Sequence, residues 1–95
     1  MKTALLIVNF LILDPQALQL YKEKVPATLK KYEATTLLST KKEVILGEPE
    51  FSHVSIFRFP SKEAILLWFN SEDYKKLSTL RDKAIKAEFS VAEEI

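Results

Sequence analysis

Arg81 occupies a position where a helical pattern calls for an apolar residue. It follows Tyr74 by seven residues and Leu77 by four, so all three fall on one face of a helix. A buried guanidinium needs a partner, because an unpaired charge in a protein interior is very costly. Two interpretations follow. Arg81 either has a structural role, through an ion pair, a helix-end hydrogen bond or a stem that carries its charge out to solvent, or it binds an anion at a pocket with Tyr74 beside it.

Asn9 and Arg58 are polar residues within apolar strand patterns. Buried amides in folded proteins are hydrogen-bonded. Asn9 therefore either makes a local hydrogen bond or serves as a polar anchor in a cavity between two sheets. The strands that carry Asn9 and Arg58 are expected to be neighbours, so the two side chains could lie close together. The face that each side chain occupies depends on the strand register.

Two further candidates are His53, the single histidine, and Trp68. His53 opens an expected strand, where a lone histidine is usually exposed; a general base is the alternative, although no nucleophile is recognisable beside it. Trp68 is most simply a core residue, but its ring could stack on a ligand. No metal-ligand cluster or cofactor motif is recognisable, and we expect neither group. The candidates for a ligand pocket are therefore Asn9, His53, Arg58, Trp68, Tyr74 and Arg81, and no catalytic residue can be assigned.

The composition indicates one small globular domain over residues 1–95, in which 47% of the residues are hydrophobic. The absence of cysteine excludes disulfides and thiolate chemistry and fits a reducing compartment, so we expect a cytoplasmic protein. A net charge of +1 provides no field that would attract nucleic acid or an acidic membrane. The single glycine leaves no glycine-rich phosphate loop.

The apolar stretch from Leu5 to Leu13 superficially resembles the core of a signal peptide. However, Asn9 interrupts it, Asp14-Pro15 follows it, and no small-residue cleavage site comes next. The stretch is also too short to span a bilayer. We therefore expect a buried strand and no membrane partner.

Hydrophobic periodicity and capping residues predict the order β-α-β-β-α-β. Helices are expected after the caps Asp14, Ser61 and Ser71, and Pro26 predicts a kink or a break in the first of them. The helix after Ser71 should carry its apolar face as far as Ile85. We expect strands over residues 5–13, 35–40, 44–46, 53–59 and 89–95.

This order is that of the ferredoxin-like α+β fold, in which helices cover one face of a four-stranded antiparallel sheet. The first strand is apolar on both of its faces, so both faces must be covered. The simplest solution is a homodimer in which two sheets pack face to face and form a dimeric α/β barrel.

Several motifs in the second half of the chain carry a family resemblance. They are Phe59-Pro60-Ser61-x-Glu63-Ala64, Trp68-Phe69-x-Ser71 and Tyr74-x-x-Leu77-x-x-Leu80-Arg81. With Asp14-Pro15 and Tyr21 in the first half, the chain resembles the family called domain of unknown function thirteen-thirty, a group of dimeric α/β barrels. The chain departs from the family pattern at Glu33-Ala34, His53 and Arg58, among other positions. The resemblance implies the fold and the dimer but no reaction.

Three functions remain open at this stage. The first is a small-molecule pocket in each protomer, with or without catalysis by a cofactor-independent enzyme on a small organic substrate. The second is a non-catalytic dimeric module for structure or binding. The third is an RNA-recognition module, whose sheet motifs residues 5–10 and 54–59 loosely echo. The near-neutral charge and the missing basic-Gly-aromatic opening argue against the third, so we expect no nucleic-acid partner.

Overall fold

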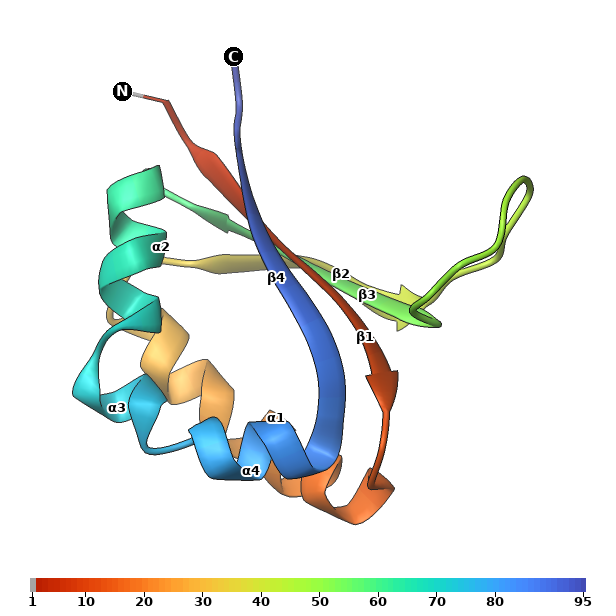
Figure 1. Ribbon diagram of the computed structural model, residues 1–95. Coiled ribbons are helices and arrows are strands. Elements are labelled where there is room, and N and C mark those ends of the chain that lie inside the picture. The colour runs from red at the N-terminus through yellow and green to blue at the C-terminus, as the bar shows by residue number, and fades with distance from the viewer. Residues whose placement is uncertain (1) are drawn as a thin grey trace.

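The computed structural model describes residues 2–95 and has the expected four-stranded antiparallel sheet with helices on one face (Figure 1). The strand order is β2-β3-β1-β4, which is the ferredoxin-like arrangement. In chain order the elements are β1 (Ala4–Ile12), α1 (Pro15–Lys30), β2 (Thr35–Lys41), β3 (His53–Phe59), α2 (Lys62–Phe69), α3 (Glu72–Lys75), α4 (Ser78–Ala84) and β4 (Ile85–Glu93).

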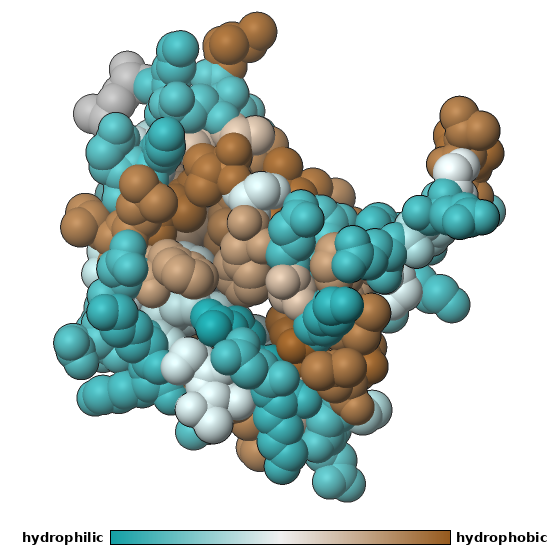
Figure 2. Space-filling model, in the orientation of Figure 1, coloured by the Kyte–Doolittle hydropathy of each residue, from teal (hydrophilic) through white to brown (hydrophobic). Residues whose placement is uncertain are grey.

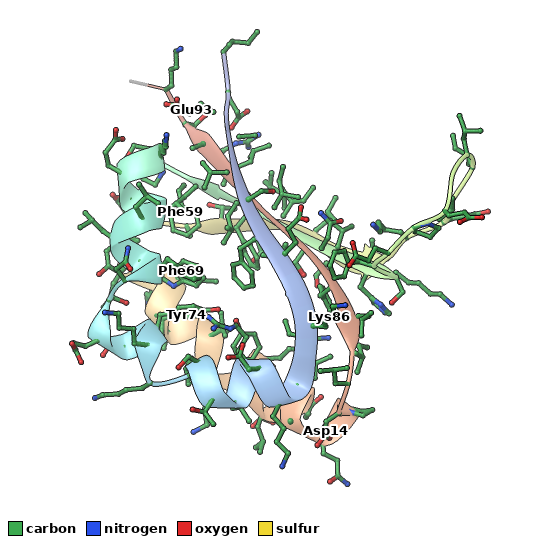
Figure 3. The ribbon with its side chains drawn as sticks, viewed as in Figure 1. Asp14, Phe59, Phe69, Tyr74, Lys86 and Glu93 are labelled. Atoms are coloured by element: carbon green, nitrogen blue, oxygen red, sulfur yellow. The ribbon has the colours of Figure 1, made fainter. Side chains whose placement is uncertain are left out.

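The core lies between the sheet and the helices. Side chains of β1 alternate between buried and half-buried, because successive residues of a strand point to opposite faces. Trp68 and Tyr74 are the largest of the fully buried side chains, and the ring of Phe59, from β3, packs on that of Trp68 with centres 5.8 Å apart. Figure 3 labels Phe59 and Tyr74. The other face of the sheet, called the open face below, carries no helix. From β1 it presents Leu5, Ile7, Asn9 and Leu11.

The three predicted helix caps are confirmed. The Asp14 carboxylate accepts hydrogen bonds from the backbone N–H groups of Gln16 and Ala17, at 3.0 and 3.2 Å. The hydroxyl oxygens of Ser61 and Ser71 likewise accept from N–H groups in the first turns of α2 and α3. These side chains satisfy donors that have no partner within the helix.

Of the kink or break predicted at Pro26, the break is wrong, because α1 continues through Pro26 to Lys30, and the kink stays a prediction. Proline removes only one helical hydrogen bond, and the flanking residues Val25, Thr28 and Leu29 are all buried against the core. Tertiary packing therefore keeps the helix whole.

The predicted helix after Ser71 is divided into α3 and α4, and Ile85 does not belong to it. The backbone at Ile85 is extended, with φ −141° and ψ 153°, and Ile85 pairs with Ile12 as the first residue of β4. The last strand thus begins four residues before the predicted start at Phe89. Pairing along the whole of β1 outweighs the helical periodicity that made Ile85 look like a helix residue.

The predicted strand over residues 44–46 is also wrong. These residues belong to an arm, residues 42–52, which connects β2 to β3 and extends away from the helices (Figure 1). Ile45 and Leu46 at its tip are 98% and 93% exposed, and the space-filling view shows this apolar tip standing apart from the body (Figure 2). Gly47, with φ +96°, takes the left-handed conformation that the turn at the tip requires.

Candidate functional site

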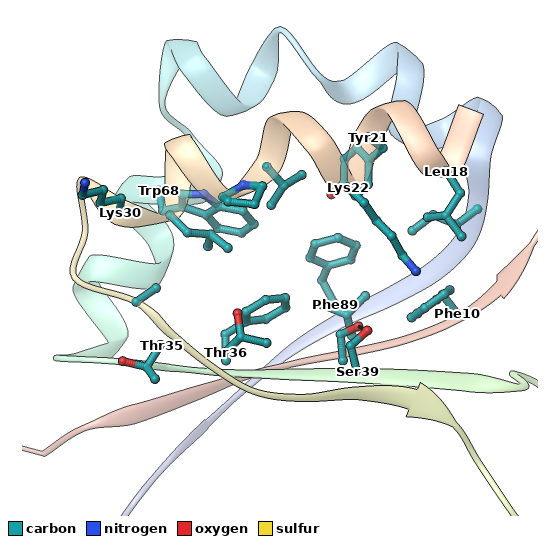
Figure 4. A pocket seen from close by; sticks show the side chains of 18 of the residues that line it. Phe10, Leu18, Tyr21, Lys22, Lys30, Thr35, Thr36, Ser39, Trp68 and Phe89 are labelled. Carbon is teal, nitrogen blue, oxygen red and sulfur yellow. Dashed lines mark hydrogen bonds between the residues drawn. The ribbon is translucent and has the colours of Figure 1, made fainter. Parts of the chain in front are cut away.

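A cleft of about 650 Å³ lies between α1 and the helix-covered face of the sheet (Figure 4). Its walls are apolar because α1, β1, β3 and β4 turn their core-facing side chains toward it. Lining side chains include Leu18, Val25 and Leu29 from α1, Val8 and Phe10 from β1, Phe57 from β3, Phe89 from β4 and Trp68 from α2. Most of the wall of the cleft is therefore apolar.

Polar groups occur at a few points around the cleft. Tyr21, Lys22, Ser39 and Ser55 line it, and the two serine hydroxyls hydrogen-bond to each other at 2.7 Å. The side chain of Lys22 runs from α1 toward the sheet (Figure 4). Pro26 also lines the cleft, and because proline has no N–H, the Lys22 carbonyl lacks its usual helical partner. The cleft thus offers both donors and an acceptor to a ligand.

Tyr21 joins the cleft to the buried core behind it. Its hydroxyl oxygen lies 2.5 Å from that of Tyr74, and either group could be the donor. Burial is the largest cause that raises the pKa of Tyr21, and the neighbouring Tyr74 raises it further. Burial also raises the pKa of Tyr74. Both phenols therefore stay neutral at ordinary pH, which suits them to hydrogen bonding and not to base catalysis.

Arg81 is held among three aromatic rings. Its guanidinium carbon lies 5.8, 5.6 and 5.7 Å from the ring centres of Phe69, Tyr74 and Phe89, respectively, within the range of a cation–π interaction. The Nε atom donates to the Asp82 carboxylate at 3.0 Å. Burial alone would lower the pKa of Arg81, but Asp82 and Tyr74 outweigh it and raise that pKa.

The side chain of Arg81 is 18% exposed and borders a second, smaller hollow of about 270 Å³. Phe89 and Ile85 line this hollow as well as the main cleft. Arg81 itself does not line the main cleft. The structure therefore provides the partners that a buried guanidinium requires, and it separates Arg81 from the cleft by aromatic side chains.

Trp68 and Tyr74 lie on the cleft side of the sheet. Trp68 lines the cleft and is 2% exposed, with its indole N–H donating to the Thr28 hydroxyl at 3.0 Å. The rings of Trp68 and Tyr74 have centres only 4.0 Å apart. Tyr74 thus forms a layer behind the cleft and contacts it through Tyr21 and Trp68.

Asn9 and Arg58 lie on the open face, away from the cleft. Asn9 pairs with Val54 and Arg58 pairs with Leu5, so the two residues are four positions apart along the paired strands, roughly 13 Å. Asn9 accepts a hydrogen bond from Lys42 Nζ at 3.1 Å. Arg58 donates to both carboxylate oxygens of Glu94, at 2.7 and 3.2 Å.

His53 lies at the end of the sheet and does not line the cleft. Its ring stacks on Phe10 with centres 5.3 Å apart, and its Nδ1 is 2.8 Å from the Ser52 hydroxyl. Phe10 does line the cleft, so the ring of Phe10 separates His53 from the cleft. Its place in the sequence predicted an exposed residue. His53 is instead half-buried and packs on Phe10.

Sequence reasoning missed Tyr21, Lys22 and the Ser39–Ser55 pair as parts of a site. In the sequence, Tyr21 stands out only as a residue of the family resemblance. A tyrosine on the core-facing side of a helix carries a hydroxyl that must find a partner, and that requirement was the available signal. The serine pair depends on the register of β2 with β3, in which Ser39 faces Ser55 across a sheet that bulges between Thr36 and Leu38. No local pattern indicates that bulge.

Among residues 2–95, no group of three or more histidine, aspartate or glutamate side chains could hold a metal ion. Within the same residues, no helix is both long enough and apolar enough to cross a membrane.

The fold and the cleft define a ferredoxin-like α+β protein with a cavity between its helices and its sheet. The chain belongs to the DUF1330 family, a domain of unknown function, whose model matches residues 3–95. No curated protein matches the chain in sequence.

Similar solved structures agree with this assignment. A protein of unknown function from Rhodopseudomonas palustris is 14% identical with a TM-score of 0.81, over 99% of this chain and 83% of that one. SnoaB, a cofactor-independent oxygenase from Streptomyces nogalater, is 10% identical with a TM-score of 0.73, over 100% and 95%. A dimeric ferredoxin-like protein of unknown function from Bacteroides fragilis is 10% identical with a TM-score of 0.64, over 97% and 96%. At these identities the likeness concerns the fold alone.

Proposed function

We propose that the protein binds a small organic molecule in the cleft between α1 and the sheet. The observation that supports this most directly is a hollow of about 650 Å³ whose lining is mostly apolar and also includes hydroxyl groups and the charged side chains of Lys22, Lys30 and Glu33. Pockets for small ligands commonly have this size and this balance of apolar and polar lining. A flat, ring-containing molecule suits the cleft because Phe57, Phe89 and Trp68 provide aromatic walls.

The polar groups suggest where an oxygen of the ligand would be held. Tyr21 is neutral and can donate its O–H to a carbonyl or phenolic oxygen. Lys22 adds a cation on the same helix. The proposed ligand is therefore an apolar aromatic molecule with at least one oxygen acceptor, held by Tyr21 at one end and by packing elsewhere.

We propose ligand binding and assign no catalytic residue. The neutral phenol of Tyr21 is a poor general base, and the serines that line the cleft bond to each other, with no base recognisable beside them. Turnover of a bound molecule without a cofactor would extend the proposal to an enzyme. A cleft that binds nothing would leave a non-catalytic module as the function.

We also propose that two copies pack their open faces together. The chain forms a slab of 35 × 31 × 16 Å, and residues such as Leu5, Ile7 and Leu11 are only half-buried on its open face. One structural neighbour is described as dimeric. Face-to-face packing of the two sheets would cover these residues, as in a β-sandwich.

A titration of Trp68 fluorescence tests ligand binding, because Trp68 is the only tryptophan and lines the cleft. The probe is 6-propionyl-2-dimethylaminonaphthalene, an aromatic ketone. We expect saturable energy transfer from Trp68 to the probe. The variant Thr36→Phe, which fills the cleft from β2, should weaken binding at least about tenfold, whereas Thr79→Phe on α4 should not.

Failure of the aromatic ketone and of a broad set of aromatic phenols and acids to bind saturably would remove the proposed function. Binding that is equally strong in Thr36→Phe would place the ligand elsewhere on the protein.

A further inference from the structure

The arm that joins β2 to β3 exposes apolar side chains to an unusual degree. Ile45 is 98% exposed and Leu46 is 93% exposed, and Val44 beside them is 45% exposed. Single exposed apolar residues are normal on protein surfaces. Here the exposed residues are consecutive and stand on a projection that touches nothing else at its tip (Figures 1 and 2). Clusters of this kind mark contact sites.

The base of the arm is fastened to the open face of the sheet. Lys42 Nζ donates to Asn9, and Glu50 pairs with Lys86 at 3.8 Å. Lys86 is opposite Leu11 in the register of β4 with β1, so it shares the face of Asn9. The arm therefore leaves the body from the face that carries no helix, and its tip extends away from the helices (Figure 1).

We propose that the arm is a clasp, and that its tip packs on a second copy of this chain when the two open faces meet. The inference rests on the face-to-face dimer of the preceding section and assigns the arm a part in it. Packing of the open faces brings the base of each arm to the interface. The partner's surface can then bury the apolar side chains of the tip, which are exposed to solvent in one chain alone.

The sheet face alone is small for a stable interface. Four strands about 4.8 Å apart, the longest with 9 residues at about 3.3 Å each, span roughly 19 × 30 Å, whereas a stable interface takes about 800 Å² from each partner. An arm that packs on the second copy would supply contact area that the sheet face lacks. The charges near the base of the arm are paired within one chain, Glu50 with Lys86 and Arg58 with Glu94, so the contact proposed for the tip rests on Ile45 and Leu46.

The test is sedimentation equilibrium of the full chain, which gives the dissociation constant of the dimer. In the variant Ile45→Ser/Leu46→Ser this constant should rise at least about tenfold, because two apolar side chains per protomer lose their burial. The matched control is Leu66→Ser/Leu67→Ser, which changes two exposed leucines on α2, on the helical side. The control should leave the constant unchanged.

The variant Ile7→Asp separates the clasp from the dimer itself, because Ile7 lies on the open face. A dimer that Ile7→Asp disrupts but the arm variant leaves unchanged would overturn the clasp while the face-to-face dimer stands. A wild-type chain that stays monomeric at high micromolar concentration would overturn both proposals, without bearing on ligand binding in the cleft.

A second measurement locates the tip directly. The chain has no cysteine, so Ile45→Cys introduces one unique attachment point for a benzophenone photo-crosslinker. Illumination after mixing with an isotopically labelled wild-type chain should join the tip to a peptide of the labelled copy. Crosslinks found only within the cysteine-bearing chain would show that the tip folds back on its own protomer and would overturn the clasp.

Discussion

The hydroxyl oxygens of Tyr21 and Tyr74 lie 2.5 Å apart although the residues are separated by 53 positions in the sequence. Tyr21 comes from α1 and lines the cleft, whereas Tyr74 comes from α3 and is 1% exposed. The bond ties the two halves of the fold together at the wall of the proposed ligand site. The rings also meet edge to face, with centres 6.5 Å apart. Substitution of either tyrosine should therefore change both the affinity for a ligand and the free energy of unfolding.

Replacing Tyr21 by phenylalanine should weaken binding of the aromatic ketone by about twofold to tenfold, because one hydrogen bond contributes roughly 0.5–1.5 kcal/mol. Binding of 2-dimethylaminonaphthalene, which lacks the carbonyl, should change much less. Fluorescence titrations of both probes provide the comparison. Tyr32→Phe is the control, since Tyr32 does not line the cleft. Equal losses for the two probes would mean that Tyr21 shapes the cleft without bonding to the ligand.

The tyrosine pair should make the protein sensitive to alkali. Because burial raises the pKa of Tyr21 in the folded state, the unfolded chain loses this proton first, from about pH 10 upward. Above that pH the unfolded state binds fewer protons than the folded state, so the free energy of unfolding falls as pH rises. Urea unfolding at pH 8 and pH 10.5 should show a smaller fall in Tyr21→Phe than in the wild type. An equal fall in both proteins would contradict this assignment.

Removing the acceptor of the Trp68 indole should destabilise the core. In Thr28→Val the indole N–H would remain buried without a partner, which costs about 1–3 kcal/mol. The Thr28 hydroxyl also donates to the Val25 carbonyl at 2.7 Å, and that bond would be lost as well. Urea unfolding monitored by Trp68 fluorescence measures the change. The exposed Thr79→Val on α4 should stay within about 0.5 kcal/mol of the wild type.

Arg81→Met distinguishes the two roles considered for this arginine. Loss of the contacts with three rings and with Asp82 should lower the free energy of unfolding by about 1–2 kcal/mol. Lys83→Met, at a side chain that is 70% exposed, should change it by less than about 0.5 kcal/mol. Unfolding and probe titration should be measured on both variants. If Arg81→Met folds normally but loses binding, the arginine belongs to the ligand site.

Much of the fold could be predicted because its signals are local. The caps Asp14, Ser61 and Ser71 have side-chain oxygens that satisfy the first N–H groups of a helix, and this requirement can be read from the sequence. The strands predicted over residues 5–13, 35–40 and 53–59 follow from runs of apolar and β-branched residues bounded by turn residues. The position of Arg81 among core residues also follows from helical spacing. Three aromatic rings around its guanidinium group stabilise the charge there.

The errors occurred where tertiary contacts decide the structure. Residues 44–46 have the composition of a strand, but β-structure needs a partner strand, and these three residues pair with none in the chain. Ile85 fits a helical stripe and a strand equally well, and pairing with Ile12 selects the strand. The cleft could not be predicted residue by residue, because its lining depends on register, which places Asn9 and Arg58 on the opposite face.

Phe89 lines both the cleft and the smaller hollow beside Arg81, so the two spaces share one aromatic ring as a wall. The ring belongs to a strand whose backbone pairing with β1 does not depend on the side chain. The side chain at position 89 can therefore change the size of the cleft without disturbing the hydrogen bonds of the sheet. A smaller side chain at position 89 would join the cleft to the hollow beside Arg81, so the proposed ligand site could change in shape and charge while the pairing of the sheet stays the same.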